Sequence, residues 1–197
     1  MQMVPCVTLH RNAAHDYSVS NKAVVNTMVL TLISFSTVSV VWSLIGYSLA
    51  FGPNEGAADG WMGGGSFGAF DSSDKARAGT SVPEHAYFIF QLMFATITAA
   101  VVSGAVVQRI TLWAWALFSA IWVLLVYVPL ARWVFYSNGW LLQWGVLDFA
   151  GGLVVETASG VSAFVLAHLL GHGRVPHGAA HNVPLVLLGM GLLWFGW

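Results

Sequence analysis

The sequence predicts an all-α protein, a polytopic membrane helix bundle. Of its 197 residues, 57% are hydrophobic and only 8% are charged, whereas about 25% of the residues in ordinary soluble domains are charged. The mean hydropathy is +0.74. Apolar segments of about 20 residues, the length that crosses a bilayer as a helix, recur along the chain. We therefore expect an integral, multi-pass membrane protein in contact with lipid.

Five apolar segments are predicted to be membrane helices. A Gly-Pro pair closes the first, at Gly52, and arginines follow the second and third, at Arg109 and Arg132. The fifth is still running at Trp197, and its length of roughly 22 Å falls short of a hydrocarbon core of about 30 Å. We therefore expect the chain to stop inside a helix. The predicted spans are 23–52, 86–107, 112–130, 147–170 and 183–197.

The segment 53–85 differs in kind, because it holds five of the eight acids and a run of glycines. This composition predicts a long aqueous loop, and a plain connector is its simplest interpretation. If the spans alternate in direction, Lys22, Arg109 and Arg174 share one side of the membrane. The positive-inside rule places that side in the cytoplasm.

The fourth span carries two acids, Asp148 and Glu156, and no Lys or Arg. At 100° per residue, small and polar side chains form one stripe and bulky apolar ones the other. The acids are eight residues, about 12 Å, apart along a helix, so Asp148 is expected near one interface and Glu156 near the middle of the bilayer. The first stripe is Asp148, Gly151, Gly152, Val155, Glu156, Ser159, Ser162 and Ala163, and the second is Leu153, Val154, Val161, Phe164 and Val165.

Each acid has a structural and a functional interpretation. Asp148 could accept from unpaired N–H groups in the first turn of a helix and complement the helix dipole, or it could lie beside a cation path. Glu156 could be a protonated core carboxyl bonded to a neighbouring helix. Because a charge at the bilayer centre costs at least about 2.5 kcal/mol, intramembrane acids commonly mark ion or proton pathways, and we favour that role for Glu156.

The sequence gives little support for a disulfide, a nucleic-acid-binding surface, a metal site or an enzyme active site. The lone Cys6 cannot form an intrachain disulfide, and the seven Lys and Arg are too scattered to form a nucleic-acid-binding patch. The histidines His172, His177 and His181 share one loop, but their spacing and the lack of a nearby Cys argue against a metal site. No nucleotide-binding loop, nucleophile elbow or zinc-protease pattern occurs. We therefore expect no enzyme, no cofactor and no nucleic-acid partner.

Two aromatic residues, Phe90 and Phe94, lie one turn apart on the second predicted span. Such pairs are usually core or lipid-facing. If a cation path passes this pair, a functional role becomes the better interpretation, because ring faces attract cations that have lost water.

Four motifs, in order and spacing, resemble the ammonium transporter family (the Amt, Mep and Rh proteins). They are GYSLAFG (46–52), FQLMFATITAAVVSGAVVQRI (90–110), WGVLDFAGG (144–152) and HNVPLVLLGMGLLWFGW (181–197). The resemblance implies an eleven-helix fold of two inverted repeats, assembled as a homotrimer with one pore per subunit. The spans would be the second to fifth helices and the start of the sixth, so the N-terminal half alone is present, truncated at both ends.

The resemblance also implies roles for aromatic residues. Phe94 resembles the pore-gating phenylalanine at the floor of the outer vestibule, with Phe90 just above it. Phe135 falls where the family usually has a tryptophan whose face recruits the ammonium cation, and Trp133 lies two residues away; Trp is the stronger ring for this purpose. Trp197 matches a pore-lining tryptophan of the sixth helix.

Two carboxylates complete the implied site. Asp148 matches an aspartate near the vestibule that helps to hold the site and favours the cation. Glu156 falls on the first of two pore histidines, a position where some fungal members have Glu. A carboxylate there keeps the relay chemistry and changes its pH dependence, because Glu and His ionise in different pH ranges.

The function that the resemblance implies is ammonium transport. NH₄⁺ would be recruited, lose its proton and cross as NH₃, with or without a relayed proton. The alternative is an ammonium sensor of the same family that signals to a partner. The second pore histidine and the second repeat would lie beyond Trp197, so we expect these 197 residues alone to show no uptake.

Overall fold

The computed structural model describes residues 23–54, 58–65, 76–77, 80–171 and 182–196. Within these residues the regular structure is helical, apart from one isolated bridge between Ala76 and Pro83. Four of the described helices are long and apolar enough to cross a membrane: Val24–Phe51, Glu84–Val106, Leu112–Gln143 and Gly152–Leu170. The prediction of an all-α, multi-pass integral membrane protein is confirmed.

Three of the four spans contain a π-helical turn, a wider turn that shifts the register of the side chains after it. These turns are η2 (Trp42–Gly46), η6 (Val123–Tyr127) and η7 (Gly152–Thr157). The remaining elements are α1 (Val24–Val41), α2 (Tyr47–Phe51), α3 (Glu84–Ser103), the 3₁₀ turn η5 (Gly104–Val106), α4 (Leu112–Trp122), α5 (Val128–Phe135), α6 (Trp140–Gln143), α7 (Ala158–Leu170) and α8 (Val183–Gly196).

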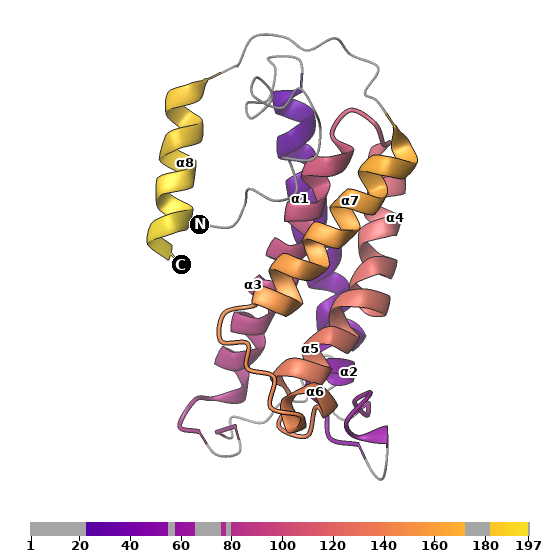
Figure 1. Cartoon of the computed structure of the whole chain (residues 1–197), viewed down its shortest axis with the longest axis vertical. Coiled ribbons are helices and arrows are strands. Elements are labelled where there is room, and N and C mark those ends of the chain that lie inside the picture. The colour runs from indigo at the N-terminus through magenta and orange to yellow at the C-terminus, as the bar shows by residue number, and fades with distance from the viewer. Residues whose placement is uncertain (1–22, 55–57, 66–75, 78–79, 172–181, 197) are drawn as a thin grey trace.

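The four long helices lie side by side, and α2, α5 and α6 gather at one end of the bundle (Figure 1). The helix α1 packs against α3 and α4, α3 packs against α7, and α2 packs against α5. After α6 the chain runs along the bundle through the non-helical residues 144–151 and the π turn η7. The helix α7 therefore begins part of the way along the bundle (Figure 1). The helix α8 stands apart, with its side chains exposed.

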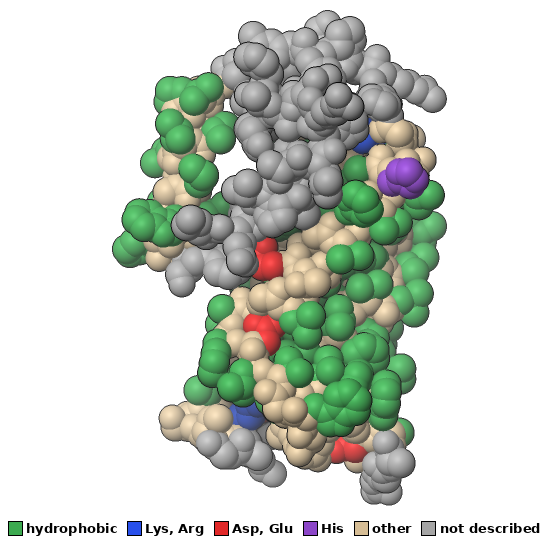
Figure 2. Space-filling model, viewed as in Figure 1, with side chains coloured by type: hydrophobic (Ala, Val, Ile, Leu, Met, Phe, Trp, Pro, Cys, Tyr) green, Lys and Arg blue, Asp and Glu red, His purple; other side chains and the backbone are tan. Residues whose placement is uncertain are grey.

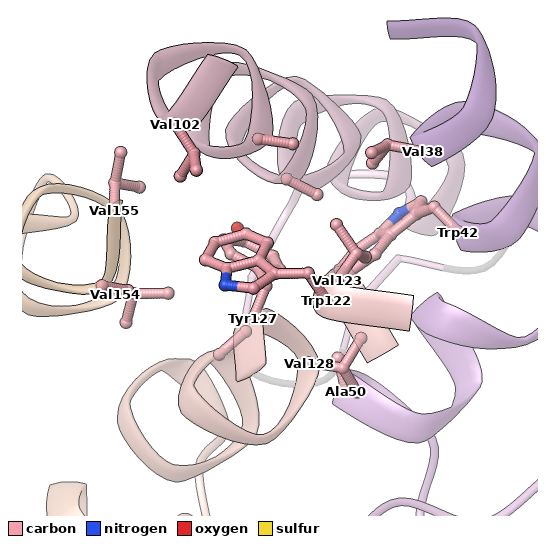
Figure 3. Close-up of a cluster of buried hydrophobic side chains, with 14 of the residues drawn as sticks. Val38, Trp42, Ala50, Val102, Trp122, Val123, Tyr127, Val128, Val154 and Val155 are labelled. Atoms are coloured by element: carbon pink, nitrogen blue, oxygen red, sulfur yellow. The ribbon is translucent and has the colours of Figure 1, made fainter. Parts of the chain in front are cut away.

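Aromatic side chains dominate the buried core, which lies where α1, α3, α4 and α7 meet. The Trp42 ring makes an edge contact with Tyr127 at 5.9 Å between centroids. Both rings are fully buried, and Tyr127 lies between Trp42 and Val154 (Figure 3). Two indole N–H groups link helices: Trp115 donates to Ser34 of α1 and Trp122 donates to Ser162 of α7. These bonds satisfy polar groups that lipid could not hydrogen-bond.

The outer surface is apolar, as a lipid-facing surface must be. Hydrophobic side chains cover most of the described part of the face in Figure 2, and charged side chains appear only as isolated spots. Exposed apolar residues occur on each long helix, including Leu32, Ile89, Leu117 and Phe164.

Two helix boundaries differ from the sequence prediction. In the third span the helix α5 continues through Arg132 to Phe135, because the Arg132 side chain is buried among hydrogen-bond acceptors and does not end the helix. Pro129 lies inside this span, as the second residue after η6. The fourth span begins at Gly152, five residues after the predicted start, because Gly151 has a φ of +90° and interrupts the helical path.

Candidate functional site

Three phenylalanine rings from two helices form a continuous series, called here the ring series. Phe90 and Phe94 of α3 lie 4.9 Å apart between ring centroids, and Phe94 makes an edge contact with Phe135 of α5 at 6.5 Å. Phe90 is 54% exposed, whereas Phe94 and Phe135 are half-buried. The series therefore runs from an exposed ring into the bundle.

Trp133 lies in a different group of rings. It contacts Trp61 and Trp140, each at 5.7 Å between centroids, and its indole N–H donates to the Trp61 carbonyl at 3.1 Å. Trp144 contacts Trp140 at 4.8 Å and completes this tryptophan cluster. Residues two apart on a helix face different directions, so only Phe135 of the two candidates points to Phe94. The tryptophan cluster also anchors part of the predicted connector 53–85 to α5.

Asp148 caps the start of η7. Its Oδ1 accepts from the N–H groups of Gly151 and Gly152 at 2.7 and 2.8 Å, and its Oδ2 accepts from Leu153 and Val154 at 2.8 and 3.2 Å. The first N–H groups of a helix have no partner within the helix, and here the Asp148 carboxylate supplies one for each of them. Asp148 therefore has the predicted capping chemistry, although it precedes the helix and is not part of its first turn.

The environment of Asp148 favours the carboxylate form. Burial would raise the pKa of this group, but the four N–H donors outweigh it and hold the pKa below its ordinary value. Hydrogen bonds to a charged group stabilise that charge. A negative charge consequently stays at the positive end of the helix dipole.

Gly151 connects this cap to the ring series. A Cβ atom at Gly151 would lie 3.6 Å from Phe94 Cδ1 and 2.6 Å from Val155 Cγ2. Only glycine adopts a φ of +90° readily and leaves this space open. The helix start and the ring of Phe94 can therefore approach closely.

Glu156 lies on η7 in the part of the bundle where α3 and α5 also pack. Its side chain is half-buried, and no hydrogen bond or ion pair from the described residues reaches its carboxylate. The Gly151 carbonyl accepts from both Val155 and Glu156, which creates the wide π turn.

The polar stripe predicted for the fourth span is partly correct. Ser159 and Ala163 are buried, and Phe164 and Val165 are exposed, as expected. Val154 was predicted to share the bulky stripe with Phe164 and Val165, and it is instead 0% exposed. The reason is η7, because a π turn does not follow the 100° rotation per residue that the prediction assumed.

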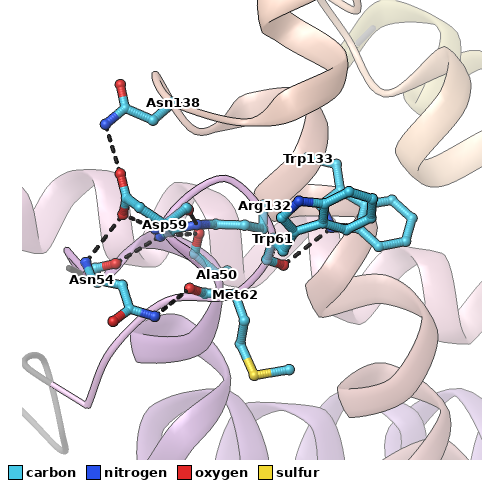
Figure 4. A network of polar contacts seen from close by, with 9 residues as sticks. Ala50, Asn54, Asp59, Trp61, Met62, Arg132, Trp133 and Asn138 are labelled. Atoms are coloured by element: carbon cyan, nitrogen blue, oxygen red, sulfur yellow. Dashed lines mark hydrogen bonds and ion pairs between the residues drawn. The ribbon is translucent and has the colours of Figure 1, made fainter. Parts of the chain in front are cut away.

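A buried arginine was missed as a structural residue by the sequence analysis. Arg132 of α5 is 0% exposed and donates to the carbonyls of Ala50, Gly52 and Asp59 and to the Asp59 carboxylate at 2.6 Å (Figure 4). Asn138 donates to the other Asp59 oxygen at 2.6 Å. This network fastens the start of the connector 53–85 to α2 and α5. Its only sequence signal was an arginine in an apolar run.

The structure does not describe the remaining residues that the sequence analysis singled out. Trp197 and the three histidines His172, His177 and His181 are outside the described residues. Within the described residues, no group of three or more His, Cys, Asp or Glu side chains could hold a metal ion.

Comparisons with known proteins identify the family. A model of the "Ammonium Transporter Family" matches residues 11–197. An ammonium transporter of Bacillus subtilis is 41% identical over 182 residues, which cover 91% of this chain and 44% of the relative. The crystal structure of Saccharomyces cerevisiae Mep2 matches with a TM-score of 0.74 and 34% identity, over 84% of this chain and 39% of that one.

A third match is a structure titled "Sensor Amt Protein", with a TM-score of 0.76 and 27% identity, over 90% of this chain and 45% of that one. The chain thus spans less than half the length of each of these three relatives. The extent of the family match and the identity to the Bacillus protein agree with the resemblance of the four motifs. The chain belongs to the ammonium transporter family.

Proposed function

We propose that the protein containing this chain transports ammonium across the plasma membrane. The observation that carries this proposal is the meeting of the ring series with the capped start of η7, where Phe94 lies beside Gly151. A cation that leaves water could rest against the ring faces of Phe90, Phe94 and Phe135, each of which offers about 0.5–2 kcal/mol of cation–π attraction. Phe94 would gate the path and Phe135 would take the place of the recruiting tryptophan.

Asp148 supports this path in two ways. Its four hydrogen bonds hold the helix start against Phe94. Its charge also offsets the positive end of the α7 dipole, which would otherwise repel a cation from the rings. Asp148 would act as a positioning residue, because its oxygens are occupied by backbone donors.

Glu156 would receive or relay the proton that NH₄⁺ gives up, so that NH₃ crosses the apolar part of the path. Its half-buried carboxylate has no described partner to hold it in one protonation state. This chemistry needs no covalent step, cofactor or metal, and we propose transport and not an enzymatic reaction. Trp197 would line the same path, by resemblance to the family.

The test replaces Glu156 in the complete gene product that contains residues 1–197, expressed in cells without their own ammonium transporters. We expect Glu156→Gln to lower methylammonium uptake at least ten-fold, because the relay needs a titratable group. Glu156→His should restore uptake with a profile shifted to higher pH, since reference pKa values are about 4.3 for Glu and 6.5 for His. Unchanged uptake and pH profile in Glu156→Gln would reject the relay.

A sensor is the second candidate, favoured by the likeness to the structure titled "Sensor Amt Protein". The transporter proposal is stronger because the relative named as an ammonium transporter has the higher sequence identity, 41% against 27%. Ammonium binding without flux in the uptake experiment would favour the sensor.

We also propose that the complete gene product is a homotrimer. Native mass spectrometry of the purified protein measures its oligomeric state.

A further inference from the structure

Arg77 inserts its guanidinium into a group of rings and a carboxylate at the same end of the bundle as the ring series. Its Nη1 forms an ion pair with Glu84 Oε1 at 3.1 Å. The guanidinium carbon lies 3.9 Å from the ring centroid of Tyr87 and 5.2 Å from that of Phe51. The hydroxyl of Tyr47 donates to the same Glu84 oxygen.

This arrangement has the composition of a cation-binding cage. A ring face attracts a cation, and the attraction increases when the cation is desolvated. Glu84 is only 8% exposed, so its carboxylate supplies negative charge where water screens it weakly. We define the cage as Tyr47, Phe51, Glu84 and Tyr87; Arg77 is its occupant.

The backbone holds Arg77 in place. Its N–H donates to the Val82 carbonyl at 2.9 Å, and its own carbonyl accepts from the N–H and the hydroxyl of Thr80 at 3.0 and 3.1 Å. The neighbouring Ala76 pairs with Pro83, just before α3. The loop 53–85 therefore delivers a cation to the start of α3, a role that a plain connector does not have.

The cage adjoins the ring series. The Tyr87 ring lies 6.3 Å from the Phe90 ring between centroids, and Phe90 is the exposed first ring of the series. The fixed charge of Arg77 is thus one ring away from the place where a substrate cation would first bind. Charges separated by less than the Debye length, about 8 Å in physiological salt, are only partly screened from each other, so a charge one ring away can influence a cation at Phe90.

We propose that the cage is a binding site for a small organic cation of the guanidinium or alkylammonium class, and that Arg77 is its resident ligand. By occupying the cage, Arg77 neutralises Glu84 and lowers the affinity of the ring series for ammonium. The cage itself is independent of the proposed function. Its effect on ammonium affinity rests on that function.

The first experiment tests whether free guanidinium binds the cage when the Arg77 side chain is removed. In the purified protein, Arg77→Ala leaves Glu84 and the rings without a cation, and we expect millimolar guanidinium to raise its thermal unfolding midpoint by a few degrees. The same concentration of sodium, and guanidinium added to the wild type or to Arg77→Ala/Glu84→Gln, should leave the midpoint unchanged. If Arg77→Ala does not fold, Arg77→Gly offers the same vacancy with more room. Equal responses in the single and double variants would overturn the proposed cage.

The second experiment measures the effect on affinity, by methylammonium uptake in the complete gene product. We expect Arg77→Gln to lower KM by about two- to ten-fold at low ionic strength, with kcat unchanged, because a repelling charge has gone. Glu84→Gln should raise KM, and Arg77→Lys should keep the wild-type value. Each difference should shrink as salt is added.

A merely structural role for the pair would lower activity in both variants and would not depend on salt. KM changes of the same sign, or changes insensitive to salt, would therefore overturn the electrostatic effect. If the wild type takes up no methylammonium, the proposed function fails, while the guanidinium experiment still decides the cage.

Discussion

The carboxylate of Asp148 accepts hydrogen bonds from four consecutive residues, Gly151 to Val154. These bonds hold the pKa of Asp148 below its ordinary value despite burial. A group whose pKa is lower in the folded state stabilises the fold at pH values above its unfolded pKa of about 3.9. That stabilisation is lost as the pH falls through the lower folded pKa.

We predict that Asp148→Asn destabilises the protein by roughly 1–2 kcal/mol at pH 7, because an amide has only one oxygen to accept from the exposed helix start. Thermal unfolding in detergent micelles measures this change. The same variant should lose less stability than the wild type between about pH 4 and pH 2, because the titrating group is gone. Matching midpoints of the two proteins at both pH values would contradict the capping role.

At the scale of elements, the start of η7 decides where both acids lie. Gly151 has a φ of +90°, and the π turn after it places Val155 and Glu156 on one shared acceptor. The helix begins within the bundle, beside α3 and α5. Glu156 is therefore half-buried although it is only the fifth residue of its span. The continuous helix of about 12 Å that was expected between the two acids is absent, because the helix begins after Asp148.

We predict that Gly151→Ala destabilises the protein more than Gly145→Ala, although both glycines have the same backbone conformation. Gly145 also has a φ of +90°, but a Cβ there would meet nothing within 4 Å. Both variants carry the cost of a left-handed conformation, about 1–2 kcal/mol. Only Gly151→Ala adds a clash, with Val155 Cγ2 at 2.6 Å, so its unfolding midpoint should be lower by several degrees. Equal midpoints for the two variants would contradict the close packing.

At the scale of the whole molecule, polar contacts close the bundle at both ends. At one end Arg132 joins Asp59 at 2.6 Å, and burial, which would raise the pKa of Asp59, is outweighed by Asn138, the Asn54 N–H and Arg132. At the other end Arg109 donates to the Gly171 carbonyl at 2.8 Å. The middle of the bundle is held by apolar packing and by the indole bonds of Trp115 and Trp122.

The two ends should face opposite sides of the membrane, with Arg109 in the cytoplasm. We predict that Ser137→Cys, in a Cys6→Ser background, reacts with a membrane-impermeant maleimide on intact cells. Thr111→Cys, at the opposite end, should react only after the cells are permeabilised. Both positions are exposed. Labelling of Thr111→Cys alone in intact cells would show the reverse orientation.

The sequence by itself determined that the protein is all-α and lies in a lipid bilayer, because hydropathy and the length of apolar runs are local properties. It also located the two acids and the motifs of the family. It did not show that the fourth span begins with η7 at Gly152, since that depends on one backbone conformation at Gly151 and on the side chain of Asp148.

Only the tertiary structure decided which aromatic ring joins Phe94. Phe135 does, and Trp133 packs with Trp61 instead, because residues two apart on α5 face different helices. The structure also explains how Arg132 and Arg77 lie among rings and apolar helices. Their partners come from segments that are distant in the sequence or from the loop 53–85, and no local pattern encodes such a pairing.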